Sequence, residues 1–400
     1  MKTLLRITHL VGLMVAAGLL LAACAPAPTA LPPTPVPTAV PTVAPPTAVP
    51  TPVPTSAPTA VVPVLATSAS LDNATSVAYD AVGNLYFSTC NEIFALDSAG
   101  MMTHFAGGGN FWTYSGDGGP ARDAGFTCIA AIAFDSAGNL WAIDQPNNRI
   151  RRFEIGGIID SVVGSGNTIG LTNVVSYITG AFAGDGGPAN EAQLWSPSAM
   201  AFDQQGNLYI LDSENYRIRK VDPAGIITTI AGVGTFGYSG DGGPALDAQM
   251  RGASRGIAVD AAGNVYFADT RNAVIRMIDL DGIMTTIAGT GEHGFSGDGG
   301  PAAEAQLTNP GGLAFDAQGR LYFVDDVTAD LNQSRIRMID EDGIITTIAT
   351  DSRRRGDPEP GNGGLAIDAQ GNVYYADNGN GLIKKVAPDG TITIVAGGGS

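Results

Sequence analysis

The sequence predicts an all-β fold, a six-bladed β-propeller built from four-stranded antiparallel blades. Three observations lead to this expectation. A tract of the form apolar-Ala-apolar-Asp-x-x-Gly-Asn recurs six times in the 400 residues, strand-like tracts follow each copy, and turn residues join the tracts in pairs. A unit that holds one antiparallel meander and recurs six times is typical of a propeller.

The first two strands of each unit are defined by a shared aspartate. The Asp-x-x-Gly tract predicts a type I turn in which the glycine is left-handed and the carboxylate accepts backbone N–H groups. Small Ala alternates with bulky residues in the first strands, which suits a sheet packed on both faces. Successive aspartates are 52 to 68 residues apart. They are Asp80, Asp135, Asp203, Asp260, Asp316 and Asp368.

A third and a fourth strand complete each unit, as in residues 217–222 and 225–232. The tract Asp222-Pro223-Ala224-Gly225 between them is a second hairpin turn. An open solenoid of strands is the alternative architecture. Because the sequence near Ser400 does not resemble a polar end cap, we expect a closed ring.

The start of the chain has the layout of an export signal. Residues 1–23 combine a short basic start with an apolar run and small residues before Cys24. The tetrad Leu21-Ala22-Ala23-Cys24 resembles a bacterial lipobox, which implies a signal peptide over residues 1–23 and lipidation of Cys24. A plain secretory signal with an incidental Cys24 is the alternative.

A proline-rich segment follows the expected signal. Between Cys24 and Pro63 lie 14 of the 25 prolines and no charged residue. Such a composition favours extended polyproline II over a packed core, so residues 24–70 are expected to be a disordered linker and residues 71–400 the propeller. An additional outer strand from residues 60–65 remains open.

The charge of the chain limits its partners. Without Lys2 and Arg6 of the leader, 19 basic side chains remain against 38 acidic ones, a net charge of −19. A nucleic-acid partner is therefore not expected, because phosphate binding needs clustered Lys and Arg.

The repeats resemble NHL repeats. The longer motif Ala-Gly-x-Gly…Tyr-Ser-Gly-Asp-Gly-Gly-Pro-Ala, at residues 231–245, is similar to that of secreted bacterial NHL proteins and of the teneurin propeller. The resemblance covers residues 75–397 and implies the propeller fold. Proteins of this fold include adhesion modules, receptor sensor domains, RNA binders, lyases and lactonases, so the resemblance does not select one function.

The strand order predicts one face of short turns and one face of long loops. The second-to-third-strand loops and the blade-to-blade crossovers share the latter, which we call the loop face, and insertions at 167–179 and 327–333 fall there. We expect binding on this face. Its candidate residues are Asp144, Asp212, Asp269, Asp325 and Asp377 at second-strand ends, Asn309 and Asn362 at first-strand starts, and Arg353, Arg354 and Arg355.

The second-strand aspartates also have a structural interpretation. Each is followed by an Asn and by a third-strand cation at one equivalent position, and such regularity favours pairing within the scaffold. The asparagines are Asn147, Asn215, Asn272 and Asn380, and the cations are Arg151, Arg219, Arg276, Arg337 and Lys384.

The Gly-Asp-Gly-Gly-Pro crossovers are candidate Ca²⁺ loops. Calcium needs six to eight oxygens, whereas each crossover offers one carboxylate, so capping of a single helical turn is the competing role. We expect no cofactor other than, at most, Ca²⁺. The aspartates concerned are Asp117, Asp185, Asp241 and Asp298.

Residues for catalysis are sparse. After the leader, the two histidines His104 and His293 lie in different units, so they do not form a three-ligand zinc site. The alternative function is a metal-assisted lyase or lactonase with a site at the mouth of the central channel. We favour a monomeric binding scaffold for an extracellular protein, peptide or glycan, attached to a membrane through its lipid anchor.

A disulfide between Cys90 and Cys128, in neighbouring blades, is one of two possible states, and buried free thiols are the other.

Overall fold

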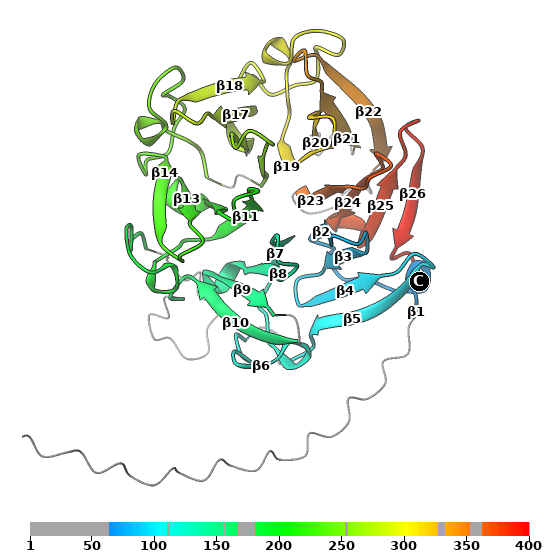
Figure 1. The fold of residues 1–400 in the computed structure, drawn as a ribbon. Helices are drawn as coiled ribbons and strands as arrows, with labels where there is room; N and C mark the ends of the chain where they lie inside the picture. The colour runs from blue at the N-terminus through cyan, green and yellow to red at the C-terminus, as the bar shows by residue number, and fades with distance from the viewer. Residues whose placement is uncertain are drawn as a thin grey trace, which may run out of the picture. The chain divides into compact units, whose positions relative to one another are not determined.

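The computed structural model describes residues 64–109, 113–154, 157–166, 181–252, 255–326, 333–352 and 362–399, which form six antiparallel sheets arranged in a ring (Figure 1). The first strand of each sheet contacts the first strands of both neighbouring sheets, and the last of them contacts the first. The six-bladed β-propeller is thereby confirmed and the open solenoid is excluded.

Each blade runs from an inner first strand to an outer fourth strand. The first strands are β2 (Ser76–Tyr79), β7 (Ile129–Phe134), β11 (Pro197–Phe202), β15 (Ile257–Val259), β19 (Pro310–Phe315) and β23 (Asn362–Ile367). The second strands are β3 (Leu85–Ser88), β8 (Leu140–Asp144), β12 (Leu208–Asp212), β16 (Val265–Asp269), β20 (Leu321–Asp326) and β24 (Val373–Asp377). The third strands are β4 (Glu92–Leu96), β9 (Arg149–Phe153), β13 (Arg217–Val221), β17 (Val274–Ile278), β21 (Gln333–Ile339) and β25 (Leu382–Val386). The fourth strands are β5 (Met101–Gly107), β10 (Ile158–Val163), β14 (Ile227–Ala231), β18 (Met284–Ala288), β22 (Ile345–Ser352) and β26 (Ile392–Ala396).

Short 3₁₀ turns occupy the loop face. Those of the crossovers are η2 (Ala121–Asp123), η4 (Ala189–Glu191), η6 (Ala245–Asp247) and η8 (Ala302–Glu304), and η1 (Ala66–Ser68) precedes blade one. Those between second and third strands are η3 (Gln145–Asn147), η5 (Ser213–Asn215), η7 (Thr270–Asn272) and η9 (Asn378–Asn380). Within the described ranges no helix is long and apolar enough to cross a lipid bilayer.

The aspartate turns have the predicted form. In blade one, the Asp80 Oδ1 accepts the N–H groups of Val82 at 3.0 Å and Asn84 at 2.8 Å, and Gly83 has a φ of +92°. In blade five, Arg320 replaces the asparagine, and its Nε donates to the Asp316 carboxylate at 2.6 Å. These turns lie on the face opposite the loop face, which we call the turn face.

Six apolar cores lie between neighbouring blades rather than within them. The core between blades one and two includes Ile93, Phe126 and Phe153, all nearly fully buried. The core between blades six and one joins Ala396 of β26 to Phe87 of β3. Because a single blade cannot bury both of its faces, every blade depends on both neighbours.

The ring is completed by the segment before blade one. The strand β1 (Val64–Leu65) pairs with β5, as β6 (Gly119–Pro120) of the first crossover pairs with β10. The turn η1 contacts β26, as η4 contacts β10. The outer strand that the sequence left open at residues 60–65 is therefore present at Val64–Leu65. Blade six has four strands of its own.

Candidate functional site

Each of four successive crossovers is held by a buried arginine from the blade that it enters. In blade three, the Arg219 guanidinium is fully buried and donates to Asp185 of the crossover at 2.7 Å and to Asp212 of the second strand at 3.3 Å. The same bridge joins Arg337 to Asp298 at 2.8 Å and to Asp325 at 3.5 Å. The crossover aspartate thus anchors the loop to the sheet.

Blades two and four are variants of this arrangement. Arg276 contacts Asp241 at 2.5 Å and Asp269 at 3.7 Å. Arg151 donates to Asp117 at 2.7 Å. The crossover aspartates do not cap the helical turns, since no side-chain cap bond is found at η2, η4, η6 or η8, and the proline is the N-cap residue itself. The single helical turn is present as predicted, with an acidic residue in its first turn, and the crossover aspartate bonds to an arginine. The acidic residues are Asp123, Glu191, Asp247 and Glu304.

The second-strand aspartates are buried, as the structural interpretation requires. Asp212 Oδ2 accepts a hydrogen bond from Asn215 at 2.8 Å, and equivalent bonds join Asp269 to Asn272 and Asp377 to Asn380. In blade two Asn147 donates instead to Thr127. Burial raises the pKa of four of these carboxyls to about 6, against the opposing effect of hydrogen bonds and arginines. They are Asp144, Asp212, Asp269 and Asp325.

Blade six keeps this charge arrangement with different residues. Lys384 contacts Asp377 at 2.6 Å and Asp351 of the preceding blade at 2.5 Å. Because a lysine donates from one point where an arginine has a fork, the Tyr375 hydroxyl supplies a second donor to Asp351 at 2.7 Å. Sequence reasoning missed Asp351 and Tyr375. A signal was present in the sequence. In blade six a lysine replaces the arginine of the other blades, and at the paired second-strand position a tyrosine replaces their Phe, Ile or Ala.

Aromatic side chains from the crossovers lie over the arginines and remain partly exposed. Phe182 is 38% exposed and Phe295 is 44% exposed. The Arg217 guanidinium lies 3.7 Å from the centroid of Phe182, and the Arg335 guanidinium lies 3.8 Å from that of Phe295. Arg149 covers Tyr114 at 4.2 Å in the same way. The loop face therefore presents aromatic–arginine pairs in blades two, three and five.

Two further aromatics extend this surface in blades three and four. Phe236 is 54% exposed and lies 4.8 Å from the Arg251 guanidinium. Tyr238 is 47% exposed and hydrogen-bonds to Thr286 at 2.9 Å. Sequence reasoning placed the crossovers on this face but did not select their aromatics, although an aromatic recurs three residues before each crossover aspartate, as in Tyr238 and Asp241.

The remaining predicted residues fall into two groups. The backbone N–H of Asn309 donates to Asp325 at 3.1 Å, and its side chain donates to the carbonyl of Asp326 at 3.2 Å, so the structure brings Asn309 and Asp325 together. Asn362 begins β23 opposite Asp377. Cys24, Arg353, Arg354 and Arg355 lie outside the described residues, and lipidation stays a prediction.

Metal binding at the crossovers also stays a prediction. Among the described residues, no three His, Cys, Asp or Glu side chains come together in a way that would hold a metal ion. The half-buried His104 contacts Glu92 at 3.5 Å, and His293 Nδ1 lies 2.7 Å from the carbonyl of Thr308. The two histidines are in different blades.

A disulfide bond joins Cys90 and Cys128. Cys90 follows β3 and Cys128 precedes β7, so the bond links blades one and two on the loop face. The backbone N–H of Ile129 also donates to the carbonyl of Cys90 at 2.7 Å. Together these bonds fix the junction between the two blades.

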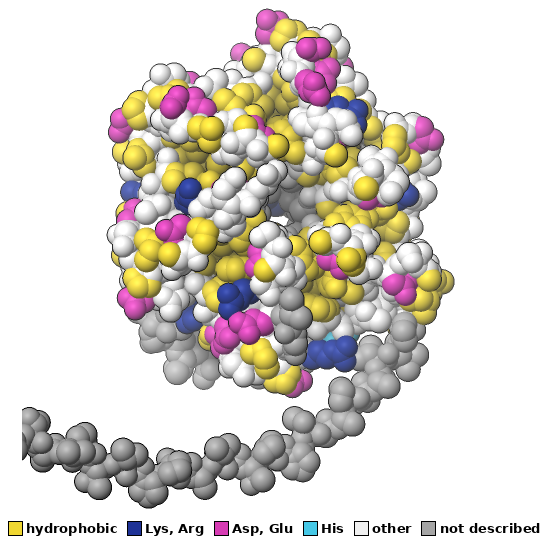
Figure 2. Space-filling model, in the orientation of Figure 1, with side chains coloured by type: hydrophobic (Ala, Val, Ile, Leu, Met, Phe, Trp, Pro, Cys, Tyr) yellow, Lys and Arg dark blue, Asp and Glu magenta, His cyan; other side chains and the backbone are white. Residues whose placement is uncertain are grey.

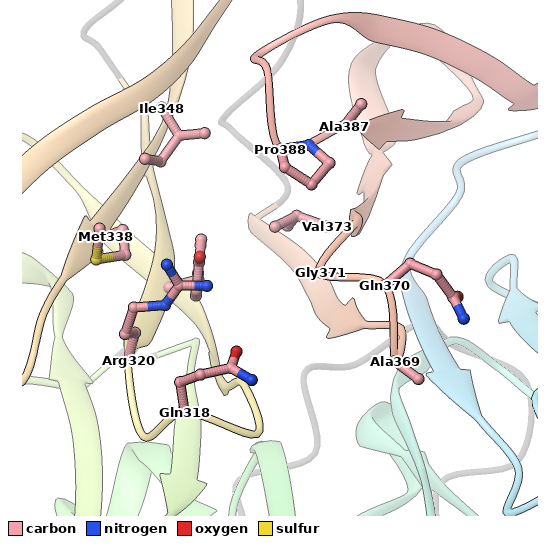
Figure 3. A pocket seen from close by; sticks show the side chains of 11 residues that line it. Gln318, Arg320, Met338, Ile348, Ala369, Gln370, Gly371, Val373, Ala387 and Pro388 are labelled. Atoms are coloured by element: carbon pink, nitrogen blue, oxygen red, sulfur yellow. The ribbon is translucent and has the colours of Figure 1, made fainter.

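A cavity of about 280 Å³ lies on the turn face between blades five and six. Figure 3 shows Gln318 and Arg320 on the blade-five side and Gln370 and Pro388 on the blade-six side. At most other junctions an aromatic ring of the second strand meets a ring of a neighbouring first strand, as in Tyr266 and Phe315. The first strand of blade six has an aliphatic residue in place of that ring. The cavity is smaller than most ligand pockets, so the candidate site remains the loop face.

Charge does not gather into a basic patch on the face that Figure 2 shows. Asp and Glu side chains are scattered around the ring, with few Lys and Arg between them, and the centre is hollowed. This distribution agrees with the acidic composition.

Comparisons with known proteins agree with the fold. Residues 176–237, 234–296 and 291–363 match the family model described as Teneurin NHL domain. Teneurin-4 of Homo sapiens is 30% identical over 248 residues, which are 57% of this chain and 8% of that protein. Teneurin-3 of Mus musculus is 31% identical over 176 residues, which are 40% of this chain and 6% of that protein. The chain therefore spans less than a tenth of these relatives.

Solved structures show the same architecture at low identity. An auxiliary nutrient binding protein from Bacteroides ovatus ATCC 8483 superposes with a TM-score of 0.52 and is 14% identical, over 81% of this chain and 70% of that chain. This likeness shows the fold alone. The six-bladed ring and the three consecutive matches over residues 176–363 support an NHL-repeat β-propeller.

Proposed function

We propose that this protein is an extracytoplasmic binding scaffold that engages a protein partner through the loop face of the propeller. The observation that carries the proposal is the row of partly exposed crossover aromatics, Phe182, Phe236, Tyr238 and Phe295. Aromatic and arginine side chains are the residues that most often dominate binding energy at protein interfaces.

The scaffold beneath these aromatics is rigid. Each crossover is tied to a sheet by a fully buried guanidinium, as Asp185 is tied by Arg219. Side chains on such loops lose little conformational freedom when a partner binds, which favours affinity. The similarity to teneurin NHL domains is consistent with a binding role.

The extracytoplasmic location is supported by the disulfide between Cys90 and Cys128, because disulfides persist in oxidising compartments. The proposed lipid anchor at Cys24 would hold the propeller at a membrane. Replacing Cys24 with Ala is expected to move the protein from the membrane fraction to the soluble fraction. Retention of the variant in the membrane fraction would refute the anchor without affecting the loop-face proposal.

The loop-face proposal is tested by capture from the native cell surface with matched variants. Phe236→Ser with Phe295→Ser removes two loop-face aromatics, whereas Val82→Ser with Leu280→Ser removes two turn-face residues that are 84% and 72% exposed. We expect the first pair to abolish capture of a partner and the second pair to leave it unchanged. Equal capture by both double variants would overturn the proposal.

A further inference from the structure

Three arginines on the loop face share one position in their blades. Arg149, Arg217 and Arg335 each lie directly across from the buried aspartate of the second strand. Each precedes the buried crossover-binding arginine by two residues, so both side chains point to the same side of the sheet. In blade four Val274 occupies the position.

These arginines bond to neutral groups. Arg217 donates to the carbonyls of Asn215 at 2.9 Å and Val233 at 3.3 Å. Arg149 donates to the carbonyl of Ser165 at 2.9 Å, and Arg335 donates to the Gln333 amide oxygen at 3.2 Å. Within the described part of the chain, no carboxylate oxygen lies within 4.0 Å of the three guanidinium groups.

The local carboxylates are already engaged. Near Arg217, both Asp212 and Asp185 contact Arg219. Burial lowers the pKa of Arg217, the two aspartates oppose this, and the charge of Arg219 adds to it. A guanidinium has five N–H donors, so donors remain on Arg217 beyond its two carbonyl bonds. One ring face of Phe182 orients the group without using those donors.

We propose that Arg149 and Arg217, which are partly exposed, receive carboxylates from an acidic segment of the partner protein. The equivalent Arg335 is only 7% exposed and is not part of the proposed site. This inference rests on the proposed function and names the chemistry of the partner. Arginine forks match carboxylates geometrically, and the adjoining aromatic rings offer apolar contact to the same segment. Arg149 and Arg217 lie in neighbouring blades, two and three, on the same face.

The negative charge of the opposite face does not prevent this contact. Each blade places an aspartate in its first hairpin turn, on the opposite face. Strands of five residues separate the two faces by roughly 17 Å, which exceeds the Debye length of about 8 Å at physiological ionic strength. The turn-face charge is therefore largely screened from a partner on the loop face.

The test measures binding of the full chain to immobilised poly-L-glutamate. The double variant Arg149→Gln with Arg217→Gln removes two loop-face charges. The matched control Arg152→Gln with Lys220→Gln removes two charges from the same third strands nearer the turn face. Saturable binding by the wild type, weakened at least tenfold in the first variant and unchanged in the control, supports the inference. Thermal melts establish that both variants are folded.

Three results would overturn it. They are no saturable binding by the wild type, equal losses in the two double variants, and arginine-dependent binding of polygalacturonate without binding of poly-L-glutamate, which would indicate an acidic glycan. If poly-L-glutamate fails while partner capture still requires Phe236 and Phe295, the acidic-segment inference falls and the binding scaffold stands. Arg→Lys at positions 149 and 217 keeps the charge but loses the fork, and we expect intermediate affinity.

Discussion

The backbone N–H of Gly397 donates to the carbonyl of Ala66 at 3.0 Å, which joins the end of the last blade to the segment before the first. The N–H of Gly164 makes the same bond to Ala189 at the crossover between blades two and three, at 2.9 Å. Residues 64–69 therefore act as the sixth junction of the ring, although the chain is not continuous there.

Removal of residues 64–69 is expected to destabilise the whole propeller. Ala66 is fully buried in the core between blades six and one, so the deletion exposes that core as well as breaking the closing bonds. The thermal midpoint should fall by several degrees, as measured by circular dichroism. A deletion ending at residue 58 is the control, and a midpoint equal to that of the control would contradict this role.

The buried arginine bridges are expected to stabilise the blades. Arg276→Met removes the partner of the buried Asp269 and should lower the free energy of unfolding by about 3 kcal/mol at pH 7.5. Arg271→Met, an exposed neighbour in the same blade, should change it by less than about 0.5 kcal/mol. Urea denaturation measures both, and equal effects would show that the bridge carries no net stability.

Stability is expected to rise as the pH falls from 7.5 to 5. Burial raises the pKa of Asp144, Asp212, Asp269 and Asp325 to about 6, well above the unfolded value of 3.8. Between these values the folded protein holds more protons than the unfolded chain, so lowering the pH favours folding. Each group contributes on the order of 1 kcal/mol per pH unit below 6.

Other titrating groups oppose this trend only weakly. Burial lowers the pKa of His104, which favours unfolding below about pH 6.5, but only one such group is involved. Asp135 and Asp203 have lowered pKa values, so the stability that they contribute is lost only when the pH falls below the ordinary aspartate pKa of 3.8. Thermal melts at both pH values give the sign directly, and Asp269→Asn should reduce the slope. A midpoint that falls steadily from pH 7.5 to 5 would refute the assignment.

The disulfide between blades one and two is expected to stabilise the ring. It closes a loop of 38 residues, for which loss of the bond costs about 2–4 kcal/mol. Reduction with dithiothreitol should lower the thermal midpoint of the wild type and leave Cys90→Ala with Cys128→Ala unaffected. If reduction leaves the wild-type midpoint unchanged, the bond has no stabilising role.

Repetition explains how much of this structure was predictable. Six copies of one turn motif predicted the blade number. Each copy is recognisable because the turn that Asp80 and its equivalents begin needs a left-handed glycine three residues later. The crossover bridges were less visible, since Asp117 and Arg151 are 34 residues apart and join different elements. Their recurrence at similar spacing, as in Asp185 and Arg219, was a usable signal.

Two features were not predicted from the sequence. Residues 64–69 lack the Gly-Asp-Gly-Gly-Pro motif of the crossovers and share with them only the two alanines, Ala66 and Ala69. The loop-face aromatics recur before the crossover aspartates, but their exposure depends on the tertiary structure. Phe236, for example, is 54% exposed, whereas Phe267 is fully buried.

Site-specific photo-cross-linking on intact cells tests the central claim most directly. A photoreactive phenylalanine at position 236 samples the loop face, and one at position 280 samples the turn face, where Leu280 is 72% exposed. We expect a discrete cross-linked protein from position 236 and none from position 280. The same adduct from both positions, or an adduct from position 280 alone, would contradict the assignment of the loop face as the binding surface.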